Sequence, residues 1–271
     1  MGDQSMRYVG APDRRDRILA TLRTTGFLSV TALARELGVS DMTVRRDLRR
    51  LAEQGKVQVV HGGVSLLHGT LQTPDFAARA KNNATAKRAI AKQALDYVDA
   101  ADTIALDAGT TTYELAQALP DDFAGTVVTN SVPVVQLLLH QPGKRLIGLG
   151  GDLVHESQAF AGPMTAEDAS RLRVRTFFLG AAAVDAKGVY VAADIERPTK
   201  LALMDIADRV VLLVDNAKFA HREPVVLCDL DRIDVLISDR SPGAEIEAAL
   251  AHHGVELRTA RSGRGEGRYA G

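Results

Sequence analysis

The sequence predicts an α/β protein of two domains, in which a small helical unit with a β-hairpin precedes a larger α/β unit. The first observation is a short basic helix that follows another helix and a Gly turn and precedes a Val-rich hairpin. The second is an alternation of short apolar runs with helical stretches beyond residue 86. At 271 residues the chain is long enough for two domains.

The stretch from Ser40 to Leu51 is expected to form a helix with two different faces. Val44, Leu48 and Leu51 recur at the spacing of one apolar stripe. Ser40 is suited to cap the N-terminus, since its hydroxyl can accept a free backbone N–H. The opposite face carries four arginines, more than solubility requires, and predicts contact with a polyanion. Its side chains are Met42, Thr43, Arg45, Arg46, Arg49 and Arg50.

Two helices are expected before this one, the nearer capped by Ser29 and stopped by Gly38, the other ending near residues 24–26. A tight turn at 38–40 joins the last two, which is the helix-turn-helix arrangement. The valines around Gly62 and Gly63 predict a hairpin wing. The alternative is a solvated charged helix in an ordinary helical bundle. The turn, the wing and the basic helix together favour double-stranded DNA as the partner.

Within the basic helix, Arg46 and Arg49 are the best candidates for reading base edges, because Arg can pair bidentately with guanine. Arg45, Arg50 and Thr43 are expected on phosphates, which position the helix without specifying a sequence.

The formal net charge of −1 conceals a difference between the two parts of the chain. Residues 1–69 hold 11 Lys and Arg against 7 Asp and Glu, and the remainder holds 22 against 27. A basic small unit beside an acidic larger one fits a nucleic-acid module joined to another activity.

Composition excludes several other classes. The single cysteine, Cys228, lies in an apolar run, so a buried structural thiol is expected, with no disulfide within the chain and no metal cluster. No signal peptide and no run of transmembrane length is apparent, and a cytoplasmic protein is expected. The first dozen or so residues and the tail lack an apolar pattern and are expected to be disordered. The predicted parts are a DNA-binding domain (13–68), a linker (69–85), a sensor domain (86–260) and the tail (261–271).

In the larger domain, helical stretches at 87–98, 113–119 and 200–207 separate several apolar runs, which predicts a mostly parallel sheet with covering helices. The predicted strands are 103–106, 126–128, 145–149, 176–179, 210–214 and 235–237.

Polar residues and glycines follow most of these strands, and ligands of such sheets bind beyond the carboxyl ends of the strands. After the first strand, Asp107–Thr112 combines a Gly with three hydroxyls at a helix N-terminus, which suits an anion. Each motif has a plain alternative as a helix cap, a turn or a surface ion pair. Their common placement favours a small phosphorylated ligand. The other motifs are Thr129–Ser131, Gly150–Gly151, Gly180 with Asp185 beyond it, and Asp215–Lys218.

These residues resemble the DeoR family of bacterial sugar-metabolism regulators, over about residues 13–240. Ser40–Leu48 and His61–Gly63 are similar to its N-terminal signature. The resemblance implies a winged helix-turn-helix fused to a sensor domain of ribose-5-phosphate isomerase-like fold. It also implies a repressor of carbohydrate operons, a phosphorylated sugar effector and a homo-oligomer, either a dimer or a tetramer. No cofactor is expected.

The resemblance places a set of residues at the effector pocket, with Lys200 where relatives usually have a basic residue. The wing departs from the family pattern at Val59, where an Arg is common, and Asp194–Arg197 has no clear match. The residues placed at the pocket are Asp107, Gly109, Thr110, Thr111, Thr129, Asn130, Ser131, Gly150, Gly151 and Lys218. The reading of the strand ends adds Thr112, Gly180 and Asp185 as candidates.

Two other functions compete with a regulator. One is a sugar-phosphate isomerase-like enzyme, in which Asp107, Asp185 and Lys218 would take acid–base roles. The other is a nonspecific architectural DNA binder, for which the larger domain would be superfluous. The joining of an arginine-rich helix to an anion pocket favours a ligand-controlled regulator that is not an enzyme.

Overall fold

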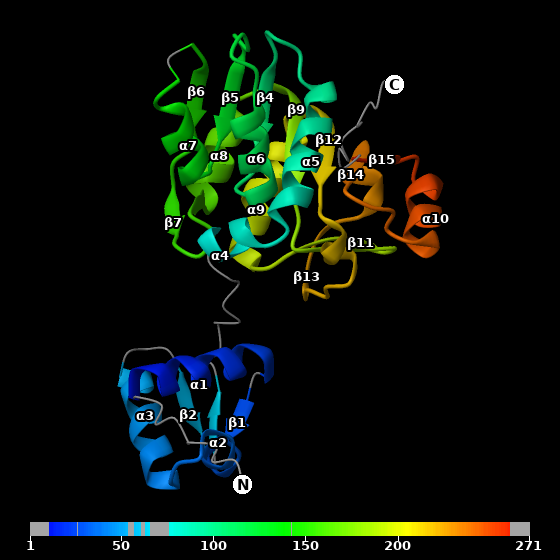
Figure 1. The fold of residues 1–271 in the computed structure, drawn as a ribbon. Coiled ribbons are helices and arrows are strands. Elements are labelled where there is room, and N and C mark those ends of the chain that lie inside the picture. The colour runs from blue at the N-terminus through cyan, green and yellow to red at the C-terminus, as the bar shows by residue number, and fades with distance from the viewer. Residues whose placement is uncertain are drawn as a thin grey trace, which may run out of the picture. The chain divides into compact units, whose positions relative to one another are not determined.

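A computed structural model describes residues 11–25, 27–53, 57–60, 63–65, 76–141 and 143–260. The chain divides into two compact units, Met1–Thr73 and Pro74–Gly271, and Figure 1 shows the elements of each. The tail and the first ten residues, both expected to be disordered, lie outside the described residues, and the first helix begins at Ala11. None of the helices in the described ranges is long and apolar enough to cross a membrane.

The N-terminal unit is the predicted winged helix-turn-helix. Its sheet is antiparallel with the order β1-β3-β2, so the predicted hairpin wing, β2 and β3, is confirmed. β1 was not predicted, because a three-residue strand shows no periodicity. The elements are α1 (Ala11–Thr25), β1 (Phe27–Ser29), α2 (Val30–Leu37), α3 (Asp41–Glu53), β2 (Gln58–Val60) and β3 (Gly63–Ser65).

The predicted caps form in this unit. Ser29 Oγ accepts a hydrogen bond from Ala32 N at 3.1 Å, and Gly38 ends α2 with a φ of 66°. Ser40 Oγ accepts from Thr43 N at 3.3 Å and so caps α3. The apolar stripe of α3 belongs to a core that it shares with α1, α2 and the wing.

A buried ion pair ties α3 to α1. Arg14 Nε donates to Asp47 Oδ2 at 2.6 Å, and both side chains are buried. Asp47 therefore points inward from a helix whose neighbouring arginines are exposed. A buried pair adds little net stability, but the loss of one partner strands a charge, so the pair fixes the orientation of the helix.

The C-terminal unit is built on a parallel sheet with the order β15-β14-β12-β9-β4-β5-β6. Its strands are β4 (Thr103–Leu106), β5 (Thr126–Thr129), β6 (Arg145–Gly148), β9 (Val174–Gly180), β12 (Ala207–Leu213), β14 (Val235–Ser238) and β15 (Glu256–Thr259). Two smaller antiparallel sheets accompany it: β7 (Asp152–Val154) with β8 (Ala159–Ala161), and β10 (Ala183–Asp185), β11 (Gly188–Val191) and β13 (Val225–Cys228).

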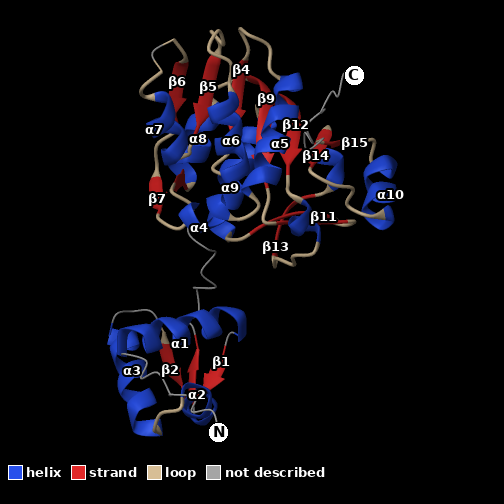
Figure 2. Ribbon diagram, viewed as in Figure 1, coloured by secondary structure: helices blue, strands red, loops and turns tan. Residues whose placement is uncertain are grey.

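Helices cover both faces of the large sheet (Figure 2). Alternate strand residues face opposite layers: Phe178 and Val211 pack with α5, α6 and α7, whereas Phe177 and Leu212 pack with α8, α9 and α10. The helices are α4 (Phe76–Lys81), α5 (Ala84–Ala94), α6 (Thr110–Ala118), α7 (Val132–Leu138), α8 (Pro163–Ser170), α9 (Arg197–Asp205) and α10 (Ala244–His252). The 3-10 turns are η1 (Leu95–Tyr97), η2 (Asp194–Glu196), η3 (Asn216–Phe219) and η4 (Leu230–Arg232).

The strands predicted from the apolar runs are all present, so the α/β class is confirmed. The helix after β4 begins earlier than predicted and takes Thr110–Thr112 into its first turn. α4 and the start of α5 lie inside the range expected to be a linker, because Phe76 is buried there against Tyr113 of α6.

Candidate functional site

The carboxyl ends of β4 and β9 meet at the point where the sheet order reverses. From β4 the chain adds β5 and β6 on one side, and from β9 it adds β12, β14 and β15 on the other. Asp107 follows β4 directly, and its Oδ2 accepts a hydrogen bond from Gly180 N, at the end of β9, at 2.9 Å. Ligands of open parallel sheets bind at this kind of switch point.

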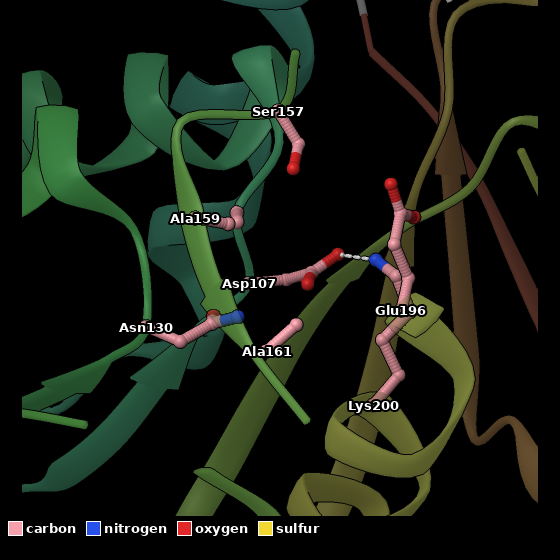
Figure 3. Close-up of a pocket in the computed structure, with 8 residues that line it drawn as sticks. Asp107, Asn130, Ser157, Ala159, Ala161, Glu196 and Lys200 are labelled. Atoms are coloured by element: carbon pink, nitrogen blue, oxygen red, sulfur yellow. Dashed lines mark hydrogen bonds and ion pairs between the residues drawn. The ribbon is translucent and has the colours of Figure 1, made fainter. Parts of the chain in front are cut away.

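A small pocket opens at this point (Figure 3). It has room for about one water molecule. Its lining residues are Asp107, Ala108, Asn130, Ser157, Ala159, Ala161, Glu196 and Lys200.

An ion pair between Asp107 and Lys200 crosses the pocket, and both side chains are buried. Lys200 Nζ also donates to Gly180 O at 3.3 Å. Glu196 is the last residue of η2 and lies about one turn before Lys200 of α9. Burial raises the pKa of Glu196; the nearby Lys200 cation lowers it and the Asp107 carboxylate raises it further. The pocket thus holds two acids and one lysine.

Two polar atoms in the pocket lack hydrogen-bond partners among the described residues. Asn130 and Ser157 are each 5% exposed. Asn130 Nδ2 donates to Phe160 O at 2.7 Å, whereas Asn130 Oδ1 and Ser157 Oγ have no such partner. An unsatisfied buried polar group costs about 1–3 kcal/mol, which a ligand that supplied the missing bonds would recover. Ser157 was not predicted, because it lies between β7 and β8 rather than at the end of a predicted strand.

The threonines predicted near the pocket divide into two groups. Thr112 Oγ1 donates to Asp107 O at 2.6 Å and accepts from Gly109 N at 3.0 Å, so it serves as a helix cap. Thr129 Oγ1 donates to Leu106 O and ties β5 to β4. Thr110 and Thr111 lie in the first turn of α6, where backbone N–H groups favour an anion. Ser131 caps α7 through Val134 N at 3.4 Å.

A cluster of cations lies among α4, α5 and η3; we call Arg79, Lys87 and Lys218 the cation cluster. Lys87 Nζ donates to Arg79 O. Burial lowers the pKa of Lys87 to about 8; Asp215 opposes this change, and the charges of Lys218 and Arg79 reinforce it. Burial likewise lowers the pKa of Lys218, with Asp215 opposing and Arg79 reinforcing.

Only Lys218 of the cation cluster was predicted. Lys87 lies within the predicted helix 87–98 but was not identified as a site residue. A signal was available, since Lys87 shares the i, i+3, i+4, i+7 stripe with the buried Ile90, Ala91 and Ala94. A lysine on an apolar stripe is unusual unless it is paired.

Of the predicted effector-site residues, only Asp107, Asn130 and Lys200 line the pocket, and two of the motifs that lie outside the lining have clear structural roles. Thr165 Oγ1 of α8 donates to Gly150 O at 2.7 Å, and a Cβ at Gly151, whose φ is 143°, would lie 2.1 Å from that oxygen. The Gly pair therefore permits close packing against α8. Asp185 accepts hydrogen bonds from Lys187 N and from the Tyr190 hydroxyl at 3.0 Å, which stabilises the turn between β10 and β11.

The expected burial of the single cysteine is confirmed. Cys228 is buried, and burial raises its pKa to about 11, so it is a poor nucleophile. The described residues contain no group of His, Cys, Asp and Glu suited to hold a metal ion.

The second candidate surface is the outer face of α3. All four of its arginines are exposed, and Met42 is 71% exposed. Thr43 is half-buried, with its hydroxyl 3.0 Å from Ser40 Oγ. Val59 on the wing is 49% exposed. His61, predicted to contact DNA, lies outside the described residues.

Comparisons with known proteins match both units. Residues 14–70 match the model of the DeoR-like helix-turn-helix domain, and residues 82–240 match the DeoR C terminal sensor domain.

Relatives align over most of both chains. The L-fucose operon activator of Haemophilus influenzae is 32% identical, over 89% of this chain and 97% of its own. The transcriptional repressor AccR of Agrobacterium fabrum is 30% identical, over 89% and 95%. The glycerol-3-phosphate regulon repressor of Escherichia coli is 29% identical, over 90% and 97%.

Among solved structures, ribose 5 phosphate isomerase A from Neisseria gonorrhoeae matches with a TM-score of 0.37 and 16% identity, over 49% of this chain and 52% of its own. This TM-score is too low to bear on fold or activity. The two domain models and the full-length relatives are sufficient: the chain belongs to the DeoR family and is a DNA-binding transcriptional regulator.

Proposed function

We propose that this regulator represses a carbohydrate-metabolism operon and that a phosphorylated sugar or sugar derivative in the pocket controls its affinity for operator DNA. The supporting observation is that acceptors line the pocket and that Arg79 of the cation cluster is close enough to Glu196 of the lining to lower the pKa of that carboxyl. The cation cluster, with the first turn of α6, suits a phosphate. Asp107, Glu196 and Asn130 Oδ1 are acceptors that suit sugar hydroxyls.

The proposed contacts follow the same division. On the effector side the candidates remain Asp107, Gly109, Thr110, Thr111, Asn130, Gly180, Lys200 and Lys218, to which we add Lys87, Glu196 and Ser157. Thr112, Thr129, Ser131, Gly150 and Gly151 support these residues through backbone contacts. On the DNA side the candidates are Ser40, Met42, Thr43, Arg45, Arg46, Arg49, Arg50 and His61.

The names of the relatives support both parts of the proposal. One is an activator of an L-fucose operon and another represses a glycerol-3-phosphate regulon. Both names concern genes that are grouped by a sugar or by a polyol phosphate. One relative activates and another represses, so repression rather than activation by this chain is part of what we propose.

The regulator is proposed to act in the cytoplasm as a homo-oligomer, a dimer or tetramer that places two α3 helices in major grooves about 34–36 Å apart. The effector must bind one conformation better than the other, because only differential affinity shifts such an equilibrium. The chain is proposed not to be an enzyme, and incubation with sugar phosphates should yield no isomerisation above the background rate.

The proposal is tested in two steps with the full chain. A thermal-shift screen against sugar phosphates should raise the melting temperature with at least one compound, by mass action on the folded state. An electrophoretic shift of the protein's own promoter should be stronger than that of random DNA and should weaken with that compound. Equal binding to random DNA contradicts specific repression, and a blank screen contradicts the effector class.

A further inference from the structure

The short helix α4 is the first described element after the wing, and one of its anchors, Glu156, directly precedes the pocket residue Ser157. At its start, Phe76 N donates to Glu156 O at 3.1 Å. The Phe76 ring meets the Tyr113 ring edge-on, with centroids 5.7 Å apart. At its end, Arg79 O accepts the hydrogen bond from Lys87 Nζ. Just beyond it, Asn83 Nδ2 donates to Asp215 Oδ1 at 2.8 Å.

Each anchor is next to a residue that we propose to contact the ligand. Glu156 precedes Ser157, whose buried hydroxyl lacks a partner among the described residues. Tyr113 follows the threonines in the first turn of α6. Lys87 belongs to the cation cluster, and Asp215 begins the turn that carries Lys218.

The loop that carries Ser157 is under backbone strain. Gln158 has a φ of 50°, an unusual conformation for a residue other than glycine. Val132 N donates a hydrogen bond to Gln158 O at 2.9 Å, and Glu156 O accepts one from Phe76 N of α4. A ligand that hydrogen-bonds to Ser157 Oγ therefore acts on a loop with one end on α7 and the other on α4.

We infer that α4 couples the pocket to the DNA-binding unit, with Ser157 and Lys87 as the residues through which the ligand acts on it. A phosphate beside Lys87 competes with the Arg79 carbonyl for the ammonium hydrogens, and a hydroxyl bound to Ser157 moves the Glu156 carbonyl that holds Phe76. The inference rests on the proposed function, because it requires a ligand in this pocket. It goes further by naming the element that reports occupancy.

The first experiment needs no ligand. Phe76→Ala and Tyr113→Leu each remove the ring contact of α4, and Tyr97→Leu is the matched control, since Tyr97 is another half-buried tyrosine whose hydroxyl bonds Glu256. Both test variants should speed amide hydrogen exchange in residues 76–81 and weaken operator affinity by at least about fivefold, the lower end of usual coupling. The control should change neither.

This experiment can overturn the inference in two ways. Faster exchange in α4 with wild-type operator affinity would show that α4 does not affect DNA binding. Weaker operator affinity in both variants with unchanged exchange in residues 76–81 would show that DNA binding does not depend on the order of α4. Two variants on opposite sides of one contact guard against a folding defect in either.

The second experiment adds inorganic phosphate and glycerol 3-phosphate as probes. In Phe76→Ala, calorimetry should show that a probe binds with wild-type affinity. The factor by which the probe changes operator affinity should be less than half of the factor in the wild-type protein. A wild-type change in this variant overturns the coupling role of α4. If neither probe binds the wild-type protein, that result counts against the proposed effector, and the first experiment still decides on α4.

Discussion

Ser157 separates function from stability at the scale of a single residue. Most buried hydroxyls are hydrogen-bonded, and their removal weakens the fold. The Ser157 hydroxyl has no partner among the described residues, so the folded state gains little from it. We therefore expect Ser157 to be retained for what it contacts in the bound state.

Ser157→Ala is predicted to leave the free energy of unfolding unchanged or slightly higher, because it removes an unsatisfied buried group. It should lower the affinity for the effector found in the thermal-shift screen by about tenfold, which corresponds to the loss of one good hydrogen bond. Urea unfolding and calorimetry measure the two effects. Ser170→Ala, at an exposed serine on α8, is the control and should change neither. A loss of stability without a loss of affinity would contradict a ligand contact.

Lys87 is predicted to make ligand binding depend on pH. Its pKa is lowered from 10.5 to about 8, so between these values the folded state binds fewer protons than the unfolded state. Stability from this group therefore rises with pH across that window, and the full penalty is present below pH 8. A phosphate needs the charged lysine, so affinity should move in the opposite direction.

We expect the affinity for a phosphorylated ligand to fall about tenfold from about pH 7 to about pH 9, where the phosphate itself no longer titrates. Lys87→Arg should reduce this dependence, because a guanidinium stays charged throughout. Lys218, whose pKa is also lowered, accounts for what remains. Calorimetry across this range checks the prediction, and an identical slope in the Arg variant would remove Lys87 from the site.

At the scale of elements, α3 combines an inner face that packs against the core with an outer face that we propose to bind DNA. Arg46→Ala is predicted to cost about 1–3 kcal/mol on the preferred operator and to relax specificity at one base pair. Arg50→Ala should weaken binding to all DNA sequences alike and should reduce the slope of log affinity against log salt concentration by about one. Anisotropy titrations on the operator and its single-base variants, at several salt concentrations, distinguish the two. The same pattern for both arginines would contradict their division of roles.

The elements also show what a sequence reveals. Long periodic segments were predictable, because packing on one face imposes a repeat: the stripe of Val44, Leu48 and Leu51 identified α3. β15 was missed because its residues are mostly exposed, so burial imposes no alternation. At the pocket, Asp107 and Asn130 were predictable because they end strands. Ser157 and Glu196 reach it from connecting segments whose course depends on tertiary packing.

At the scale of the whole molecule, separate cores predict separate unfolding. The core of α1, α2, α3 and the wing shares no residue with the two cores of the large sheet. Leu48→Ala and Leu203→Ala should each cost about 2–5 kcal/mol, because both remove fully buried side chains. Each variant should lower the urea midpoint of only one of two unfolding transitions. Amide exchange of peptides from each unit shows which unit unfolds in which transition. A single transition shifted equally by both variants would contradict independent units.

The buried pair of Arg14 and Asp47 has a consequence for how this regulator can change its target. The pair sets the orientation of α3 from its inner side, so the exposed arginines are free to vary without disturbing the fold. Operator preference is thereby separable from domain integrity as an evolving trait. A library that randomises Arg45, Arg46, Arg49 and Arg50 should yield mostly folded domains with new preferences, whereas one that randomises Asp47 should yield mostly unfolded ones.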